Sequence, residues 1–318
     1  MSEERIILAV DGGGTKTDVV IARENGVSPL TVLARKRGGP TNPTTIGIDN
    51  ALAELQSTIA RASRAANVEP SEFAAAVFSL AGIATDEMIA DVSRWAHQND
   101  LAGDCTIVSD AELILSVADL AANETLPAVA VISGTGSIAL ANEPDSEFAV
   151  RAGGWGYLLG DEGSAFDIGK SAVRAVLHSN EGSGSGTALS SRIYVETGTD
   201  NLRDVIGYFY KQKDTRIRLA SLAPLVSEAA EEGDEVARDI LEEAGRALGR
   251  LVKTVLNQLS REKSITEYSL AMGGGVLANA ELVRESLSEY LREYGIVPHT
   301  LNIVDDPVLA AAHFGKSS

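Results

Sequence analysis

Cysteine is almost absent from this chain of 318 residues, which contains Cys105 alone. One cysteine cannot form an internal disulfide, and no Cys-x-x-Cys pair is present to hold zinc or an iron–sulfur cluster. The four histidines are scattered, without the His-Glu-x-x-His spacing of a zinc site. We therefore expect a protein of the reducing cytoplasm, with no metal held by histidine or cysteine.

Positive charge is also scarce. Lys and Arg total 27 against 45 Asp and Glu, a formal net charge of -18, which would repel a nucleic-acid backbone. No apolar run approaches the roughly 18 residues that would span a bilayer, and the N-terminus is acidic where a signal peptide would be basic. The sequence therefore predicts no nucleic acid and no membrane as partner.

The sequence contains a pattern of strands and helices that occurs twice. The first copy has predicted strands at 6–10, 19–22, 30–35, 75–80 and 106–109, and helices at 45–66, 86–97 and 111–121. The second copy has predicted strands at 128–132, 138–141, 148–152, 268–271 and 301–304, and helices at 164–177 and 276–294. In the first copy the order is βββαβαβα, and the second repeats its start.

This repeat predicts an α/β protein with two domains. Residues 1–122 form the N-terminal domain, on which a C-terminal helix at 306–318 can pack. Residues 123–305 form a larger C-terminal domain, with a mostly helical insertion at 191–259. Duplicated domains that face each other would bring the glycine-rich turn of each copy to one cleft.

The first turn, Asp11-Gly12-Gly13-Gly14-Thr15-Lys16-Thr17, is suited to binding an anion. Its glycines allow consecutive N–H groups to converge on a phosphate, with two hydroxyls and one cation as further partners. It is not a Walker loop, because threonine rather than glycine precedes the lysine, and it lacks the last glycine of the Rossmann fingerprint. The alternative is a hairpin turn that binds nothing.

Two other glycine-rich segments follow apolar runs. Ser133-Gly134-Thr135-Gly136-Ser137 has the same chemistry as the first turn, and the two together could hold the polyphosphate of a nucleotide. Gly273-Gly274-Gly275 lies between a predicted strand and a helix, where a flat or charged group could approach closely. For each segment, an ordinary tight turn is the alternative.

Asp110 ends a predicted strand where a helix begins, at the edge of a sheet where ligands usually bind. Its carboxylate could accept a proton from a hydroxyl group, or it could cap the helix. In the loop 153–164, Asp161 or Glu162 could bind sugar hydroxyls while the other stabilises the helix start. Trp155 is either a platform for a ligand or a packing residue.

In combination, these motifs resemble the BadF/BadG/BcrA/BcrD ATPase family of the actin, hexokinase and Hsp70 superfamily, and within it the N-acetylglucosamine kinase branch. The motifs that carry the resemblance run from residue 11 to 275 and are 11–17, Gly39-Pro40-Thr41-Asn42, Ser109-Asp110-Ala111, 132–137, 153–164 and 272–275. The resemblance implies two RNase H-like (actin/hexokinase-type) domains with a cleft between them, and a homodimer.

The resemblance also implies an ATP-dependent kinase that phosphorylates the 6-hydroxyl of N-acetylglucosamine, with glucosamine, N-acetylmuramic acid or glucose as alternative sugars. Asp110 would be the general base, and Asp11 would hold Mg²⁺ through water. The ATP phosphates would contact Gly13, Gly14, Thr15, Lys16, Thr17, Gly134, Thr135 and Gly136. The nucleoside would lie on Gly273, Gly274 and Gly275, and the sugar on Asn42, Asp110, Trp155 and Asp161.

Three other functions fit the sequence less well. The family's ATP-driven activators hold an iron–sulfur cluster between subunits through cysteines, which Cys105 alone cannot provide. ROK sugar kinases carry a cysteine-rich zinc motif that this chain lacks. A non-catalytic sugar or nucleotide sensor would not need Asp110 together with both glycine-rich turns.

Overall fold

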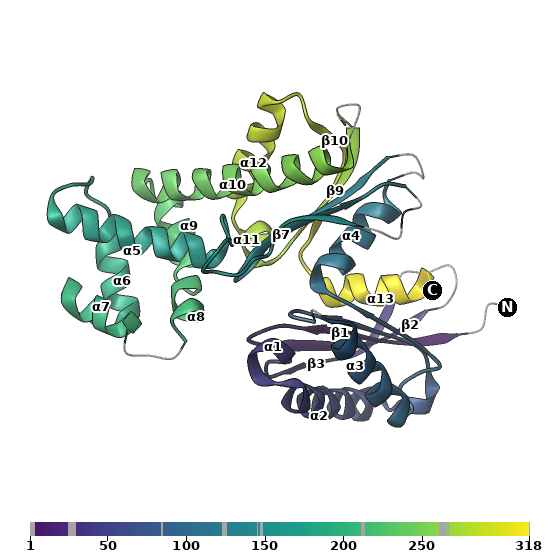
Figure 1. Ribbon diagram of the computed structural model, residues 1–318. Helices are drawn as coiled ribbons and strands as arrows, with labels where there is room; N and C mark the ends of the chain where they lie inside the picture. The colour runs from purple at the N-terminus through teal and green to yellow at the C-terminus, as the bar shows by residue number, and fades with distance from the viewer. Residues whose placement is uncertain are drawn as a thin grey trace. The chain divides into compact units, whose positions relative to one another are not determined.

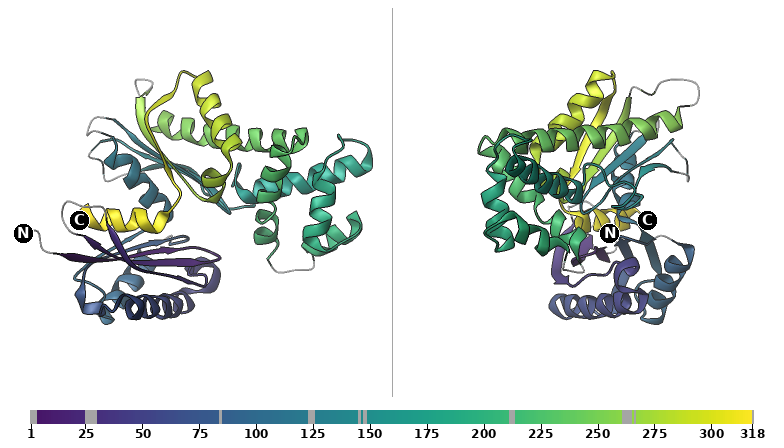
Figure 2. Two further views of the ribbon diagram at one scale, coloured as in Figure 1. Left: turned by 180° about the vertical axis from the view of Figure 1, so that it is seen from behind. Right: turned by 60° about the vertical axis from the view of Figure 1, so that its left-hand side comes forward.

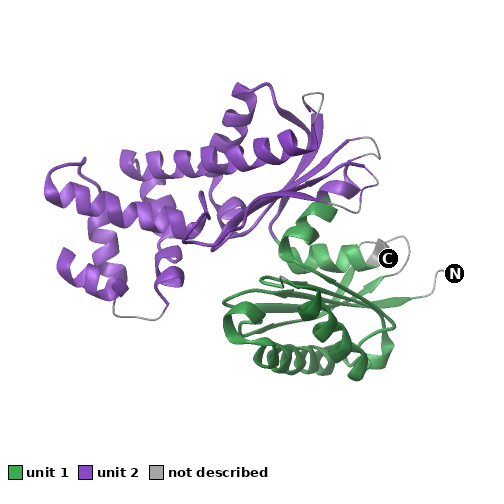
Figure 3. Ribbon diagram, viewed as in Figure 1, with its two compact units in different colours: residues 1–117, 306–318 green, residues 118–305 purple. Residues whose placement is uncertain are grey.

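The computed structural model describes residues 4–24, 30–83, 85–122, 126–144, 146, 149–210, 214–260, 265 and 267–317. The chain divides into two compact units, unit 1 with residues 1–117 and 306–318 and unit 2 with residues 118–305 (Figure 3). Each unit contains one five-stranded mixed sheet with helices packed on it. In the part of the chain described, no helix is long and apolar enough to cross a membrane.

The sheet of unit 1 has the strand order β3-β2-β1-β4-β5. The pairs β1–β2 and β2–β3 are antiparallel, whereas β1–β4 and β4–β5 are parallel. Its strands are β1 (Arg5–Gly12), β2 (Thr17–Glu24), β3 (Thr31–Gly38), β4 (Phe73–Leu80) and β5 (Asp104–Val108). Its helical elements are α1 (Pro43–Ile46), α2 (Ile48–Ala66), the 3₁₀ turn η1 (Pro70–Glu72), α3 (Asp86–Gln98), α4 (Asp110–Leu120), whose last residues belong to unit 2, and α13 (Pro307–Ser317).

β1 is apolar from Ile6 to Val10, as expected of a strand that is buried on both faces. Leu8 and Val10 belong to the hydrophobic cluster that includes residues of α2 and α3. Ala9 points the other way and packs with Val308 and Ala311 of α13. Figure 1 shows α2 and α13 on opposite sides of this sheet.

The sheet of unit 2 has the order β10-β9-β6-β7-β8, which is the order of unit 1 read from the other edge. Parallel and antiparallel pairs also match those of unit 1, so the predicted pair of βββ-type α/β domains is confirmed. The strands are β6 (Ala128–Ser133), β7 (Ser137–Asn142), β8 (Val150–Gly153), β9 (Glu267–Gly273) and β10 (Val297–Val304). The strand predicted at 148–152 thus corresponds to β8, and position 148 lies outside the described residues.

The segment 191–259 is mostly helical, as predicted. The helices of unit 2 are α5 (Ala165–Glu181), α6 (Leu189–Thr197), α7 (Leu202–Tyr210), α8 (Thr215–Ala220), α9 (Ala223–Glu231), α10 (Glu235–Leu259), α11 (Gly275–Asn279) and α12 (Glu281–Glu293). α10 buries its apolar face in the same core as β6, β7, β9 and α12 (Figures 1 and 2).

Two helices that the sequence predicts as continuous are broken. The helix expected at 45–66 is split by Gly47, whose φ of +84° is outside the helical region. The helix expected at 276–294 is split by Ala280, which has φ -99° and ψ 96°. The apolar periodicity continues through both breaks, so it does not reveal either of them.

Candidate active site

The turn between β1 and β2 consists of Gly13, Gly14, Thr15 and Lys16. The amide of Gly13 donates to the carbonyl of Lys16 over 2.9 Å and closes the turn. Among the described residues, none accepts a hydrogen bond from the amides of Gly14 and Thr15, and the Thr15 hydroxyl has no partner there either. Exposed amides and a hydroxyl at the tip of a turn can bind an anion.

The residues that flank this turn are buried and hold it in place. The Thr17 hydroxyl donates to the carbonyl of Gly39 over 2.7 Å and lies 2.8 Å from the Thr41 hydroxyl. The amide of Thr41 in turn donates to the carbonyl of Gly13 over 3.0 Å. Gly12 has no room for a Cβ atom, which would collide with the Thr41 hydroxyl. Thr17 and Gly12 therefore hold the base of the turn against the segment that contains Gly39 and Thr41.

Four carboxylates interact at the end of β1 near this turn. Burial, together with the charges of Asp110, Asp18 and Asp306, raises the pKa of Asp11 to about 7 against the opposing effect of Lys16. The described residues include no group of three or more His, Cys, Asp and Glu side chains arranged to hold a metal. A cation at Asp11 would therefore need ligands from elsewhere, as Mg²⁺ usually finds in water and substrate phosphates.

Asp110 is the first residue of α4, and it is not the cap of that helix. The Ser109 hydroxyl accepts from the Glu112 amide over 3.2 Å, and the Glu112 carboxylate accepts from the Ser109 amide over 2.7 Å. This reciprocal pair is a capping box, which leaves the Asp110 carboxylate with the adjacent Ala111 amide. Burial raises the pKa of Asp110, although hydrogen bonds from backbone amides lower it.

Asp18 is almost fully buried and is surrounded by cations. Arg37 lies 3.3 Å from its carboxylate, and Arg35 and Lys16 each lie 3.6 Å away. Burial raises the pKa of Asp18, but the three cations outweigh burial and hold the pKa below its ordinary value. Arg35 also contacts Asp306, 2.6 Å away at the start of α13. This network fixes Lys16 and α13 to the same sheet.

In unit 2, the turn between β6 and β7 consists of Gly134, Thr135 and Gly136, one residue fewer than the turn in unit 1. The Gly134 amide donates to the Gly136 carbonyl over 2.9 Å. Neither the amides of Thr135 and Gly136 nor the Thr135 hydroxyl donates to any residue that the structure describes. This turn thus has the same kind of unpaired donors, although its residues are half-buried where those at the tip of the first turn are exposed.

The loop after β8 is held against this turn. The hydroxyls of Ser133 and Ser137 donate to the carbonyls of Gly163 and Glu162 over 2.8 and 2.7 Å. Asp161 is 3% exposed and accepts from the Ser137 amide over 3.2 Å. The other Asp161 oxygen lies 3.1 Å from the guanidinium of Arg216, in α8. Asp161 and the turn therefore form one hydrogen-bonded group within unit 2.

The glycine triplet lies beside the same turn. Gly273 ends β9, and Gly275 begins α11. Gly274 has φ +90°, and a Cβ atom there would collide with the Ser133 carbonyl. A Cβ atom at Gly275 would meet nothing within 4 Å. Gly274 therefore allows close packing of the protein itself, whereas open space lies beside Gly275.

The residues predicted to bind sugar are distributed over both units. In unit 1, Asn42 caps α1, and its Oδ1 accepts from the Thr44 amide over 3.0 Å, which leaves its Nδ2 without a partner among the described residues. Trp155, in unit 2, is 65% exposed, with the Arg151 guanidinium 4.5 Å from its ring centre. Exposure on this scale is unusual for a packing residue.

The order of these motifs along the chain matches a family model, that of the "BadF/BadG/BcrA/BcrD ATPase family", over residues 8–312. The chain belongs to this family. The resemblance seen in the sequence is therefore confirmed, and with it the use of ATP that the family name states.

Named relatives of this BadF/BadG/BcrA/BcrD chain are sugar kinases. An N-acetylmuramic acid/N-acetylglucosamine kinase of Clostridium acetobutylicum is 30% identical over 90% of this chain and 90% of its own length. An N-acetyl-D-glucosamine kinase of Dictyostelium discoideum is 29% identical over 100% of this chain and 99% of its own. A ROK family glucokinase of Streptomyces griseus, solved with glucose and AMPPNP, shares the fold with a TM-score of 0.64 at 17% identity, over 98% of this chain and 100% of its own. The predicted hexokinase-type fold is therefore confirmed.

Sequence reasoning missed three features of the site in this family member. Asp18 follows the first motif directly, and a hairpin centred on the glycine-rich turn would have placed it opposite Asp11, its cross-strand partner in the structure. Arg216 is 55 residues from Asp161, and no local pattern links them. The capping box was readable as Ser-x-x-Glu at 109–112 and would have decided between the two interpretations of Asp110.

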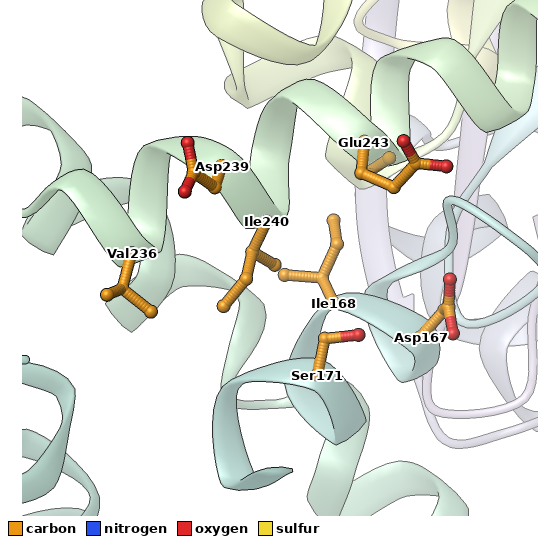
Figure 4. Close-up of a pocket in the computed structure, with 8 residues that line it drawn as sticks. Asp167, Ile168, Ser171, Val236, Asp239, Ile240 and Glu243 are labelled. Carbon is orange, nitrogen blue, oxygen red and sulfur yellow. The ribbon is translucent and has the colours of Figure 1, made fainter. Parts of the chain in front are cut away.

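Unit 2 also contains a cavity of about 260 Å³ between α5 and α10. Figure 4 shows Ile168 and Ile240 pointing toward each other across it, with Asp167 and Glu243 nearby. None of the site residues predicted from the sequence lines this cavity. In each unit, the predicted site residues lie instead at the glycine-rich turn and on nearby loops and carboxylates.

Proposed function

We propose that the protein is an amino-sugar kinase that transfers the γ-phosphoryl group of ATP to the 6-hydroxyl of N-acetylglucosamine, giving N-acetylglucosamine 6-phosphate and ADP. The observation that carries this proposal is that Asp110, freed from capping by Ser109, interacts with Asp11 next to a turn with exposed amide donors. The sugar kinases among the relatives support the same chemistry.

In this proposal Asp110 accepts the proton of the sugar hydroxyl as that oxygen attacks the γ-phosphorus. The raised pKa of Asp110, caused by burial, increases its affinity for that proton. The capping box of α4 fixes the backbone that carries this carboxylate. Placement matters more than basicity, because phosphoryl transfer depends chiefly on positioning and on neutralising charge.

The surroundings of Asp11 fit Mg²⁺. Its pKa of about 7 reflects burial among other carboxylates, an environment in which a divalent cation would favour the charged form. Asp11 would hold the ion through water, with the ATP phosphates as further ligands. The bound ion would neutralise charge on the phosphates.

The ATP phosphates would accept hydrogen bonds from the amides and hydroxyls of the two turns, with Lys16 as a cation. Thr15 and Thr135 have hydroxyls available for this, whereas the Thr17 hydroxyl already donates to Gly39, so we assign Thr17 to support of the turn. The remaining phosphate contacts would come from Gly13, Gly14, Gly134 and Gly136, and those to the nucleoside from Gly273, Gly274 and Gly275.

The sugar would contact Asn42, Trp155 and Asp161 in addition to Asp110. The Nδ2 of Asn42 is available to a sugar oxygen, and the exposed ring of Trp155 offers an apolar face. The Asp161 carboxylate is already engaged by the Ser137 amide and Arg216, so a sugar hydroxyl would share one of its oxygens. A homodimer and a cytoplasmic location remain predictions from the family resemblance and the single cysteine.

The function can be tested by coupled ADP release with Mg-ATP and N-acetylglucosamine, glucosamine, N-acetylmuramic acid, glucose or no sugar. We expect release with N-acetylglucosamine, and no phosphorylation of its 6-deoxy analogue. Asp110→Asn should lower kcat by about 10²- to 10⁴-fold with sugar binding kept. Asp86→Asn, at the first position of α3 in the same unit, is the matched control and should change neither. Equal ADP release without sugar would contradict the proposal and indicate an ATPase.

A further inference from the structure

Arg216 lies at the turn between β6 and β7, although it comes from a distant helix. Its Nη2 is 3.1 Å from the Asp161 carboxylate, and a Cβ atom on Gly136 would lie 2.8 Å from the same nitrogen. Gly136 therefore lacks a side chain at the point where the guanidinium approaches the turn backbone. The guanidinium carbon of Arg216 also lies 5.7 Å from the ring centre of Tyr157.

Most of the hydrogen-bonding capacity of Arg216 is unused. Its Nε is buried without a hydrogen-bond partner, and the bond to Asp161 is its single hydrogen bond to a described residue. A guanidinium has five N–H donors in a fixed planar arrangement. A side chain that is 39% exposed and anchored at one nitrogen can direct other donors to a ligand without further ordering.

The turn beside Arg216 lacks a cation of its own. The unit 1 turn contains Lys16, whereas the turn of unit 2, Gly134-Thr135-Gly136, is uncharged. Its amides and the Thr135 hydroxyl offer donors, and Arg216 adds a positive charge that favours binding of a phosphate. The single ion pair with Asp161 orients the guanidinium toward the turn.

We propose that Arg216 binds a phosphate group of the nucleotide at the β6–β7 turn, held in position by Asp161. This inference rests on the proposed kinase function, since it takes ATP as the ligand of the turn. It gives α8 of the helical insertion a part in nucleotide binding that neither turn motif reveals.

The test compares wild type with Arg216→Gln and Arg216→Lys, using inorganic tripolyphosphate, ADP and adenosine as probes in calorimetry. Arg218→Gln is the matched control, because Arg218 lies on the same helix and stacks on Tyr208, 4.7 Å away. Loss of a charge-assisted hydrogen bond should raise the Kd for tripolyphosphate and ADP about 10- to 100-fold in Arg216→Gln. Adenosine binding should stay within about twofold, Arg216→Lys should recover part of the loss, and Arg218→Gln should bind as wild type does.

Steady-state kinetics supply the second readout. The KM for ATP should rise in Arg216→Gln while the KM for the sugar is unchanged. A rise in the sugar KM alone would show that Arg216 orients Asp161 for the sugar, and equal losses for adenosine and tripolyphosphate would show a structural role; either result overturns the inference. If no sugar is phosphorylated by wild type, the kinase proposal fails, yet the tripolyphosphate comparison still decides the role of Arg216.

Discussion

Replacing Asp11 with asparagine should stabilise the ligand-free protein while removing its activity. Burial and the neighbouring Asp110 and Asp18 raise the pKa of Asp11 from 3.8 to about 7. At about 1.4 kcal/mol per pKa unit, the charged form is disfavoured in the folded state by about 4 kcal/mol at alkaline pH. Asparagine has nearly the same shape and carries no charge, so it should recover a large part of this free energy.

The pH dependence follows from the direction of the shift. Between pH 3.8 and about 7, the folded wild type binds a proton at Asp11 that the unfolded chain has lost. The free energy of unfolding of wild type therefore falls as pH rises through this window, whereas the variant has no such contribution. The stability difference between variant and wild type should grow from near zero at the acid end to its full value above pH 7.

The two tryptophans allow unit 1 to be followed alone. Trp95 packs edge-on against Phe78 in the core of unit 1, with 6.1 Å between ring centres, and Trp155 lies in unit 2. In a Trp155→Phe background, urea unfolding at several pH values from 5 to 8.5 reports on unit 1. Asp104→Asn, at an exposed position of the same unit, serves as control and should change stability by less than about 0.5 kcal/mol.

Two results would refute this reasoning. A stability difference that does not change with pH would mean that Asp11 titrates normally, and a destabilised variant would mean that its carboxylate makes favourable contacts in the absence of ligand. Mg-ATP provides a further check, because a ligand that binds the folded state stabilises it. It should raise the unfolding free energy of wild type and have little effect on Asp11→Asn.

Three further predictions concern the same groups. The value of kcat/KM should fall as pH drops below about 7, because protonation removes the negative charge with which Asp11 would attract Mg²⁺. A pH–rate profile at saturating Mg²⁺ measures this. In a Trp95→Phe background, urea unfolding followed by Trp155 fluorescence should show that Gly274→Ala destabilises unit 2 by about 1–3 kcal/mol, because its φ is +90°, whereas Gly275→Ala should have little effect. Ser109→Ala should lower the free energy of unfolding by about 1 kcal/mol and should also lower kcat. Thr85→Ala, which removes the equivalent cap of α3, should lower the free energy of unfolding by a similar amount and leave kcat unchanged.

The fold could be predicted because its signal is repeated along the chain. Two copies of strand, glycine-rich turn and strand give the same topology, and buried strands such as β1 read as continuous apolar runs. The helix breaks at Gly47 and Ala280 could not be predicted, because backbone dihedrals change there without a change in apolar spacing. Local periodicity thus predicts the type of an element more accurately than it predicts the residue at which the element ends.

For the candidate site, the sequence identifies residue types but does not decide what each hydroxyl contacts. Thr15 and Thr17 stand two apart in one motif, yet Thr15 is exposed at the tip of the turn and Thr17 is buried against Gly39. In the second turn the division is the same, because the Ser137 hydroxyl donates to Glu162 while the Thr135 hydroxyl is available. In both turns, then, the hydroxyl where the second strand begins donates to a loop of its own unit, and the one within the turn has no partner among the described residues. Because this division depends on contacts with loops distant in the sequence, only the three-dimensional structure distinguishes the two roles.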